Sequence, residues 1–306
     1  MFPYLYQAPD GGVSVPTYGA MIMLAFIAAT TVGFFRLRKV GIHPDILPGI
    51  VSLAIVFGIL GARLLHFLGS EPADFFSNPL ILFKLNEGGM AVYGGVLAAG
   101  LACFLYAKRQ EVHPWKLTDA LMPCFFLALA IGRLGCLAAG CCFGANAGSE
   151  IQKSLTGDLF SNGALVTVNG PPWVAAVYSG DSSHLFGAQP GLPCYPTQIW
   201  ESLAALTLFG LLSWTWASRR KFDGQILAIG MLLYPAIRST IERFRGDMIR
   251  GTDHFGLFST SQVVSFGVAL VALWIWKTRS PHGLAPEIEI EKEDDLDPDL
   301  FEDSIL

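Results

Sequence analysis

The chain has 306 residues, of which 52% are hydrophobic and only 15% are charged, and its mean hydropathy is +0.48. Soluble domains carry about 25% charged residues, so this composition excludes an ordinary soluble globular protein. The formal net charge of −5 results from an acidic C-terminal tail that carries −9, so the remainder carries +4, and we expect no nucleic-acid partner. The composition predicts an all-α integral membrane protein with several transmembrane helices.

The hydrophobic segments predict seven membrane-spanning helices. A spanning helix needs about 20 mainly apolar residues. The segments that meet this requirement are 17–35, 47–68, 90–107, 117–138, 197–217, 223–242 and 260–276. The N-terminus lacks the basic region of a cleavable signal peptide, so we expect the first span to be retained.

Basic residues predict the orientation of these spans. They follow spans 1 and 7 and separate spans 3 from 4 and 5 from 6, so they share one side if the spans alternate. They are Arg36, Arg38, Lys39, Lys108, Arg109, Lys116, Arg219, Arg220, Lys221, Lys277 and Arg279. The positive-inside rule makes that side cytoplasmic, with the N-terminus outside and the C-terminus inside.

The connections on the opposite side include one long loop. Residues 143–196 are rich in Gly, Ser, Pro and Asn and contain two alternating apolar stretches, 164–168 and 173–178. These stretches predict a short strand pair in a small exofacial (periplasmic) subdomain. The connection 243–259 carries arginines on the wrong side for the charge rule, which indicates a bound anion or a short loop that tolerates them.

The C-terminal end is acidic. The segment from Glu287 to Asp303 contains ten acidic residues and one lysine. We expect 281–306 to be a solvated, disordered cytoplasmic tail and residues 1–280 to form one polytopic membrane domain.

Arg133 is the most informative single residue. It lies in the otherwise apolar stretch 117–143, where an arginine costs roughly 2.5–3.5 kcal/mol on insertion scales. Such a residue either has a function or is a structural arginine that pairs with a buried acid or reaches an interface.

Further charged residues are predicted near the same depth. Span 5 opens with Glu201, and span 6 ends with Tyr234, Arg238 and Glu242 at four-residue intervals, which places these three on one helix face. Two arginines without a metal motif suit a phosphate, since guanidinium donates in a plane and stays charged. The glutamates either hold the arginines in place or act as bases.

Several motifs, in order along the chain, resemble the prolipoprotein diacylglyceryl transferase family. The strongest is 132–144, GRLGCLAAGCCFG. The others are 18–19 (YG), 61–63 (GAR), 87–95 (EGGMAVYGG), 195–201 (YPTQIWE) and 234–245 (YPAIRSTIERFR). The resemblance covers roughly residues 14–280.

The resemblance implies an enzyme of the bacterial inner membrane that needs no cofactor or metal. Its substrates would be phosphatidylglycerol and the signal-peptide (lipobox) cysteine of prolipoproteins. The diacylglyceryl group would form a thioether and glycerol phosphate would leave. The implied catalytic residues are Arg133, Arg238, Tyr93 and Glu242. The implied substrate-binding residues are Tyr18, Arg63, Gly94, Gly95, Gly144, Gln198, Glu201, Tyr234 and Arg245.

The sequence departs from the family at three positions. Tyr93 stands where the family often has histidine, Cys136 where asparagine is common, and Cys141 where glutamate is common. With an ordinary pKa near 10, a tyrosine is a weaker base at neutral pH than a histidine. Cys136, Cys141 and Cys142 are interpreted as small packing residues, or Cys141 or Cys142 as the partner of Cys194 in a disulfide.

Three other functions are considered. A transporter or binding protein for an anionic solute or lipid would use the arginines, but no convincing internal repeat supports it. A receptor or structural protein leaves the wrong-side arginines unexplained. A thiol-redox enzyme would rely on the adjacent Cys141 and Cys142, which form a strained pair.

Overall fold

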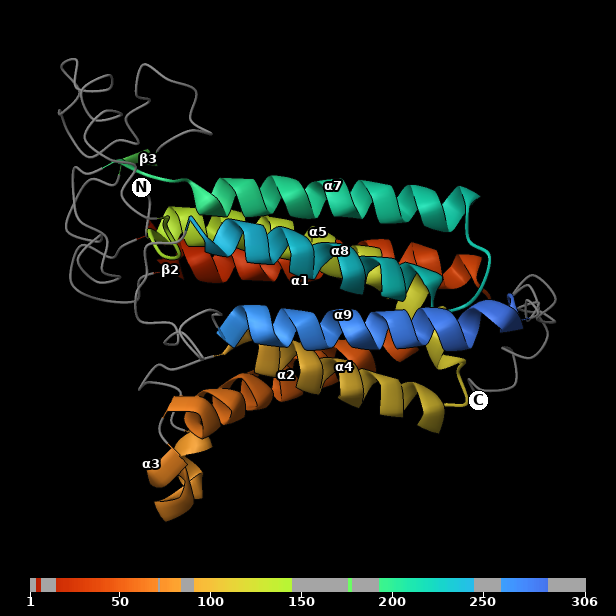
Figure 1. Ribbon diagram of the computed structural model, residues 1–306, viewed down its shortest axis with the longest axis horizontal. Coiled ribbons are helices and arrows are strands. Elements are labelled where there is room, and N and C mark those ends of the chain that lie inside the picture. The colour runs from red at the N-terminus through yellow and green to blue at the C-terminus, as the bar shows by residue number, and fades with distance from the viewer. Residues whose placement is uncertain are drawn as a thin grey trace, which may run out of the picture.

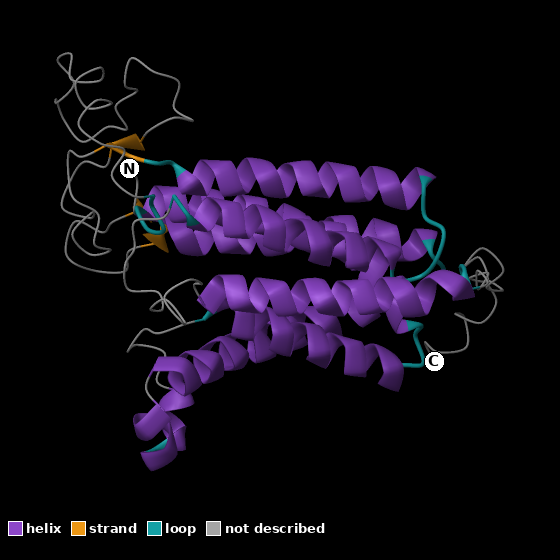
Figure 2. Ribbon diagram, in the orientation of Figure 1, coloured by secondary structure: helices purple, strands orange, loops and turns teal. Residues whose placement is uncertain are grey.

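The computed structural model describes residues 4–6, 15–70, 72–83, 91–144, 176–177, 193–244 and 260–285. These residues form seven long helices that run up and down beside one another (Figures 1 and 2). The long helices are α1 (Thr17–Lys39), α2 (Ile46–Ser70), α4 (Val92–Arg109), α5 (Pro114–Ala139), α7 (Thr197–Ser218), α8 (Gln225–Glu242) and α9 (Thr260–Arg279). The predicted all-α architecture is confirmed.

Short elements fill some of the connections. They are α3 (Pro72–Ser77), the 3-10 helices η1 (Pro79–Phe83) and η4 (Ser280–His282), and the strands β1 (Tyr4–Tyr6), β2 (Val15–Pro16), β3 (Ala176–Val177) and β4 (Pro193–Cys194). The strand pairs β1–β2 and β3–β4 are antiparallel. β3 lies within the predicted stretch 173–178 and pairs with β4. The other predicted strand, 164–168, lies outside the described residues, as does 286–306 of the predicted tail.

Four of the described helices are long and apolar enough to cross a membrane by length and composition: α1, α2, α5 and the segment 262–282 around α9. Their outward faces expose large apolar side chains, including Met23 (66%), Phe266 (68%) and Trp274 (61%). Exposed apolar residues at this density suit contact with lipid, since scattered single residues are the norm on soluble proteins. The other three long helices, α4, α7 and α8, pack against these helices.

Helix ends follow the local sequence. Pro114 occupies the first turn of α5, where its missing N–H costs nothing, and the preceding His113 ring accepts a hydrogen bond from the Lys116 N–H. The helix ends at Gly140, which takes the left-handed conformation at φ 73°. That C-terminal end brings Arg133 to one end of the bundle.

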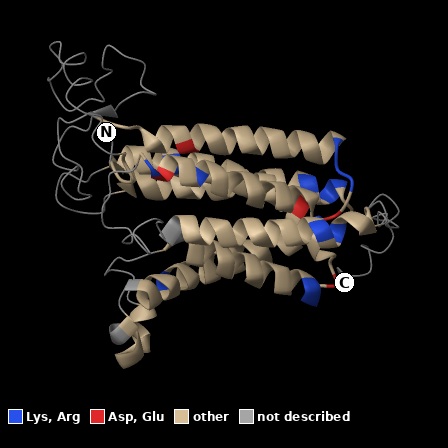
Figure 3. Ribbon diagram, viewed as in Figure 1, with Lys and Arg blue, Asp and Glu red and all other residues tan. Residues whose placement is uncertain are grey.

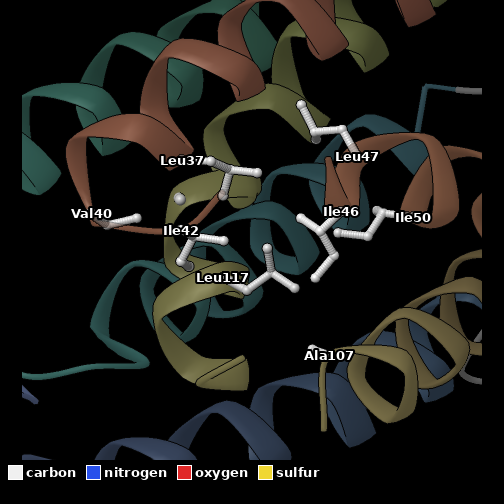
Figure 4. Packing of buried hydrophobic residues seen from close by; sticks show 9 residues of the cluster. Leu37, Val40, Ile42, Ile46, Leu47, Ile50, Ala107 and Leu117 are labelled. Atoms are coloured by element: carbon white, nitrogen blue, oxygen red, sulfur yellow. The ribbon is translucent and has the colours of Figure 1, made fainter. Parts of the chain in front are cut away.

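The two ends of the bundle differ in charge. Basic residues occupy the last turns of α1, α4 and α9, and Figure 3 shows lysines and arginines gathered at that end. An apolar cluster at the same end joins α1, α2, α4 and α5 (Figure 4). Its labelled members are Leu37, Val40, Ile42, Ile46, Leu47, Ile50, Ala107 and Leu117. This cluster fixes the basic end, so the polar residues of the opposite end are positioned by a packed scaffold.

Candidate active site

Glu201 is the shared acceptor of a buried polar cluster at the end opposite the basic residues. It lies near the start of α7 and is 1% exposed. Arg133 Nη2, from α5, lies 2.8 Å from Glu201 Oε1, and the Tyr234 hydroxyl of α8 donates to the same oxygen at 2.9 Å. One carboxylate therefore joins three helices and compensates the charge of Arg133.

A second ion pair lies on α8. Arg238 and Glu242 are four residues apart, so they occupy one helix face and form a close ion pair. Arg238 is 6% exposed, and among the described residues its Nη1 has no hydrogen-bond partner. Because a buried donor without an acceptor is costly, this nitrogen is suited to an oxygen of an anionic ligand.

Tyr93 reaches this end of the bundle from α4. Its hydroxyl lies 2.9 Å from Ser265 Oγ of α9, and it is close enough to Arg238 and Glu242 to interact with their charges. The sequence did not identify Ser265, because a single serine in an apolar span is a weak signal. The Tyr93 hydroxyl thus has a hydrogen-bonding partner on α9 and lies within electrostatic range of Arg238 and Glu242.

Two residues at the start of α7 hold the turn that follows α5. Gln198 Nε2 donates to the Cys141 carbonyl at 2.7 Å, and the Thr197 hydroxyl donates to the Cys142 carbonyl at 2.8 Å. Gln198, predicted to bind substrate, therefore also orders the backbone after the 132–144 motif.

Tyr18 and Gly144 lie at the edge of the cluster. Tyr18, on α1, is 43% exposed, packs beside Gly135 and is close enough to Arg133 to interact with its charge. The Gly144 N–H donates to the Tyr195 carbonyl at 2.9 Å. A Cβ at Gly144 would lie 2.7 Å from the Phe244 carbonyl oxygen, so close backbone packing explains this glycine.

Three predicted substrate-binding residues lie at helix contacts. Gly94 and Gly95 face α2, where a Cβ on Gly95 would lie 2.7 Å from the Gly58 carbonyl oxygen. Arg63 is fully buried in α2, stacks over Phe67 and donates to the Ile81 carbonyl at 2.9 Å. Helix packing accounts for their positions, and a role in substrate binding stays a prediction. Arg245 and Glu87 lie outside the described residues.

Three cysteines converge at the C-terminal end of α5. The sulfur atoms of Cys136, Cys141 and Cys142 all lie within 4.8 Å of one another. Hydrogen bonding with the thiols of Cys136 and Cys142, together with burial, raises the pKa of Cys141 above its ordinary value. None of the six cysteines forms a disulfide, so the considered bond to Cys194 is not present in this structure. Sequence spacing missed this cluster.

Comparison with known proteins gives one consistent result. The family profile described as "Prolipoprotein diacylglyceryl transferase" matches residues 3–278. Phosphatidylglycerol–prolipoprotein diacylglyceryl transferase 2 of Clostridium perfringens is 28% identical over 89% of this chain and 94% of its own length. The corresponding transferase of Clostridium tetani is 28% identical over 90% of this chain and 97% of its own. The transferase of Chromobacterium violaceum is 30% identical over 84% of this chain and 87% of its own length.

Proposed function

Because this chain belongs to the prolipoprotein diacylglyceryl transferase family, we propose that its two buried arginines bind the phosphate of the lipid substrate. The protein is a multi-pass membrane enzyme that transfers the diacylglyceryl group from phosphatidylglycerol to prolipoproteins.

The reaction replaces one bond at a glycerol carbon by another. The cysteine thiol of the prolipoprotein signal peptide loses its proton and its sulfur bonds to the carbon. The carbon–oxygen bond to phosphate breaks, and glycerol phosphate leaves with the electron pair. The thiolate is the reactive form, and a free cysteine has a pKa near 8.5, so the site must help to remove that proton. It must also stabilise the charge on the departing phosphate.

Arg238 and Arg133 are proposed to provide that stabilisation. The single observation that carries the assignment is that Arg238 Nη1 is buried and has no hydrogen-bond partner in the part of the chain that the structure describes, since a buried guanidinium N–H suits a phosphate oxygen. Arg133 adds a second positive charge at the same end of the bundle, held by Glu201. Glu242 and Glu201 fix the two guanidinium groups, and fixed donors cost little to reorganise when charge develops.

Tyr93 is proposed to orient the thiol or to relay its proton. Its hydroxyl is held by Ser265 and lies within electrostatic range of Arg238 and Glu242. Tyr18, Gln198 and Tyr234 would complete the polar pocket around the lipid head group. Arg63, Gly94, Gly95, Gly144 and Arg245 retain the predicted substrate-binding role as part of this proposal.

The proposed orientation places this site toward the outer leaflet. The basic ends of α1, α4 and α9 lie at the other end of the bundle and would face the cytoplasm. The N-terminus would then be outside and the C-terminus inside the bacterial plasma membrane. The loop 143–196 would lie on the side where prolipoprotein signal peptides present their cysteine.

The test uses purified protein in phosphatidylglycerol-containing vesicles with a signal peptide that has one cysteine. Mass spectrometry should show a peptide heavier by one diacylglyceryl group, and a matched serine peptide should stay unmodified. Arg133→Ala and Arg238→Ala should each lower the transfer rate by at least about 100-fold, as expected for loss of a charge-stabilising donor. If both variants kept full activity, the phosphate role would be wrong, whereas an inactive wild type would contradict the activity itself.

A further inference from the structure

The three-cysteine cluster has the arrangement of a metal site. Cys136 lies on the last turn of α5, and Cys141 and Cys142 follow the end of that helix. Their sulfur atoms lie within 4.8 Å of one another. Three sulfurs bound to one Zn²⁺ at about 2.3 Å in a tetrahedral arrangement lie roughly 3.8 Å apart. Small side-chain rotations would therefore bring the three sulfurs to ligand distance.

The backbone of the turn directs the thiols back toward the helix. Gly140 and Cys142 both have positive φ, 73° and 62°. A left-handed conformation is ordinary for glycine, but for a residue with a side chain it costs on the order of 1–3 kcal/mol and often marks a functional site. Here it folds the Cys142 side chain to the cluster. The left-handed residue Cys142 is thus also a member of the cluster.

The turn is also fixed from outside. The carbonyls of Cys141 and Cys142 accept hydrogen bonds from Gln198 and Thr197 of α7. Ligands held by supporting hydrogen bonds lose little freedom when an ion binds. The cluster is therefore prepared for an ion without a large rearrangement of the backbone.

Electrostatics favour a cation at this place. Three buried thiolates would repel one another, whereas one divalent ion reduces their total charge from −3 to −1. Arg133 lies one turn before Cys136, and its guanidinium is close enough to interact with the charges of Cys136 and Cys142. Its positive charge would stabilise the remaining charge of −1. Soft thiolate ligands select Zn²⁺ over Mg²⁺ or Ca²⁺.

We propose that Cys136, Cys141 and Cys142 bind one Zn²⁺ ion as three thiolates, with the fourth coordination position left for water or another thiol. Binding replaces three thiol protons by the ion, and those protons are released to solvent. The bound ion would hold the end of α5, and with it Arg133, against the start of α7. The proposal does not depend on the assigned roles of the arginines, because metal binding is measured without turnover.

The remaining thiols supply matched controls. Cys103 donates to the Ile50 carbonyl and Cys124 to the Ala120 carbonyl, so each lies against a helix backbone. Neither belongs to the group of three sulfurs. Replacing either by serine therefore removes a cysteine without removing a proposed ligand.

The experiment measures metal binding to purified full-length protein, treated first with reductant and chelator and then separated from both. Zn²⁺ is titrated against a chromophoric competitor, and Co²⁺ is added to a second sample to look for sulfur-to-cobalt charge-transfer absorption. We expect one equivalent of Zn²⁺ and a thiolate-type Co²⁺ spectrum. Cys136→Ser, Cys141→Ser and Cys142→Ser should each weaken Zn²⁺ binding by more than the roughly 10- to 100-fold that loss of an outer-shell partner costs.

Two results would overturn the proposal. One is a fully reduced wild-type protein that binds no Zn²⁺, and the other is undiminished binding by the triple serine variant. Cys103→Ser and Cys124→Ser should bind Zn²⁺ as the wild type does, and equal losses in these controls would also contradict the site. Thermal unfolding of each variant, measured without metal, identifies any variant that fails to fold. The single variants that do fold then decide whether the three cysteines bind Zn²⁺.

Discussion

At the scale of single residues, Arg133 and Arg238 differ in how their charges are matched. Arg133 shares Glu201 with Tyr234, so its carboxylate partner ties three helices together. Arg238 pairs with Glu242 within one helix and keeps a buried nitrogen without a partner among the described residues. Arg238 is therefore the better donor to a ligand, and Arg133 has the larger structural role.

Arg238→Lys tests whether the shape of the guanidinium matters as well as its charge. Lysine keeps the positive charge but loses the planar, two-point donation that suits a phosphate. We expect the transfer rate to fall at least about tenfold, measured with phosphatidylglycerol vesicles and a cysteine peptide. Arg109→Lys, at the exposed basic end of α4, is the matched control and should keep full activity. Equal activity of the two variants would contradict bidentate recognition.

Tyr93→Phe and Ser265→Ala separate a chemical role of the tyrosine hydroxyl from a structural one. Both changes remove the same hydrogen bond. If the hydroxyl acts on the substrate thiol, Tyr93→Phe should lower the maximal rate by about 100-fold, within the range of general acid–base catalysis, and Ser265→Ala by much less. Rates of peptide modification at saturating lipid provide the comparison. Equal losses would show that only the hydrogen bond matters.

At the scale of helices, α2 and α4 approach closely through glycine. Gly95→Ala would place a methyl group 2.7 Å from the Gly58 carbonyl, so the helices must separate. We expect a loss of about 1–3 kcal/mol in unfolding free energy, measured by thermal unfolding in detergent. Gly100→Ala, on the same helix with nothing within 4 Å, should be neutral or slightly stabilising. A stable Gly95→Ala variant with impaired lipid binding would instead support direct substrate contact.

Asp119 of α5 caps the start of a neighbouring helix. Its two carboxylate oxygens accept hydrogen bonds from the Gly224 N–H at 2.9 Å and the Leu227 N–H at 3.0 Å. Because these donors would be left buried without acceptors, Asp119→Ala should lower the unfolding free energy by roughly 2 kcal/mol. Asp45→Ala, at an exposed turn, should change the unfolding temperature little. An unaffected Asp119→Ala variant would show that water replaces the cap.

The sequence predicted the long helices well because hydropathy and length determine a membrane span locally. The predicted span 197–217 became Thr197–Ser218, and 117–138 became Pro114–Ala139. The short α3 and η1 were missed, since neither is long enough to show a hydrophobic period. Glu201 was identified from its motif, but its shared role for Arg133 and Tyr234 depends on how three helices pack. The cysteine cluster depends on a left-handed turn at Cys142, which no spacing rule predicts.

At the scale of the whole molecule, the candidate catalytic residues and the contacts that hold the helix termini together lie at opposite ends of the bundle. The Arg133–Glu201 and Arg238–Glu242 pairs lie at one end, and lysines and arginines gather at the other end (Figure 3). There Asp223, before α8, accepts a hydrogen bond from the Ala285 N–H at 2.9 Å and donates its own N–H to the Gly283 carbonyl. This contact holds the end of the α9 segment against the α7–α8 connection.

The basic residues at one end of the bundle predict the orientation of the protein in the cell membrane. Seven spans that alternate in direction, with basic last turns in α1, α4 and α9, would place the C-terminal end in the cytoplasm. Green fluorescent protein, which matures in the cytoplasm, should fluoresce when fused after residue 306, whereas alkaline phosphatase, which folds in the periplasm, should be inactive there. Both reporters fused before residue 1 should behave in the opposite way. Active phosphatase at the C-terminus would reverse the orientation and place the arginine site at the cytoplasmic leaflet.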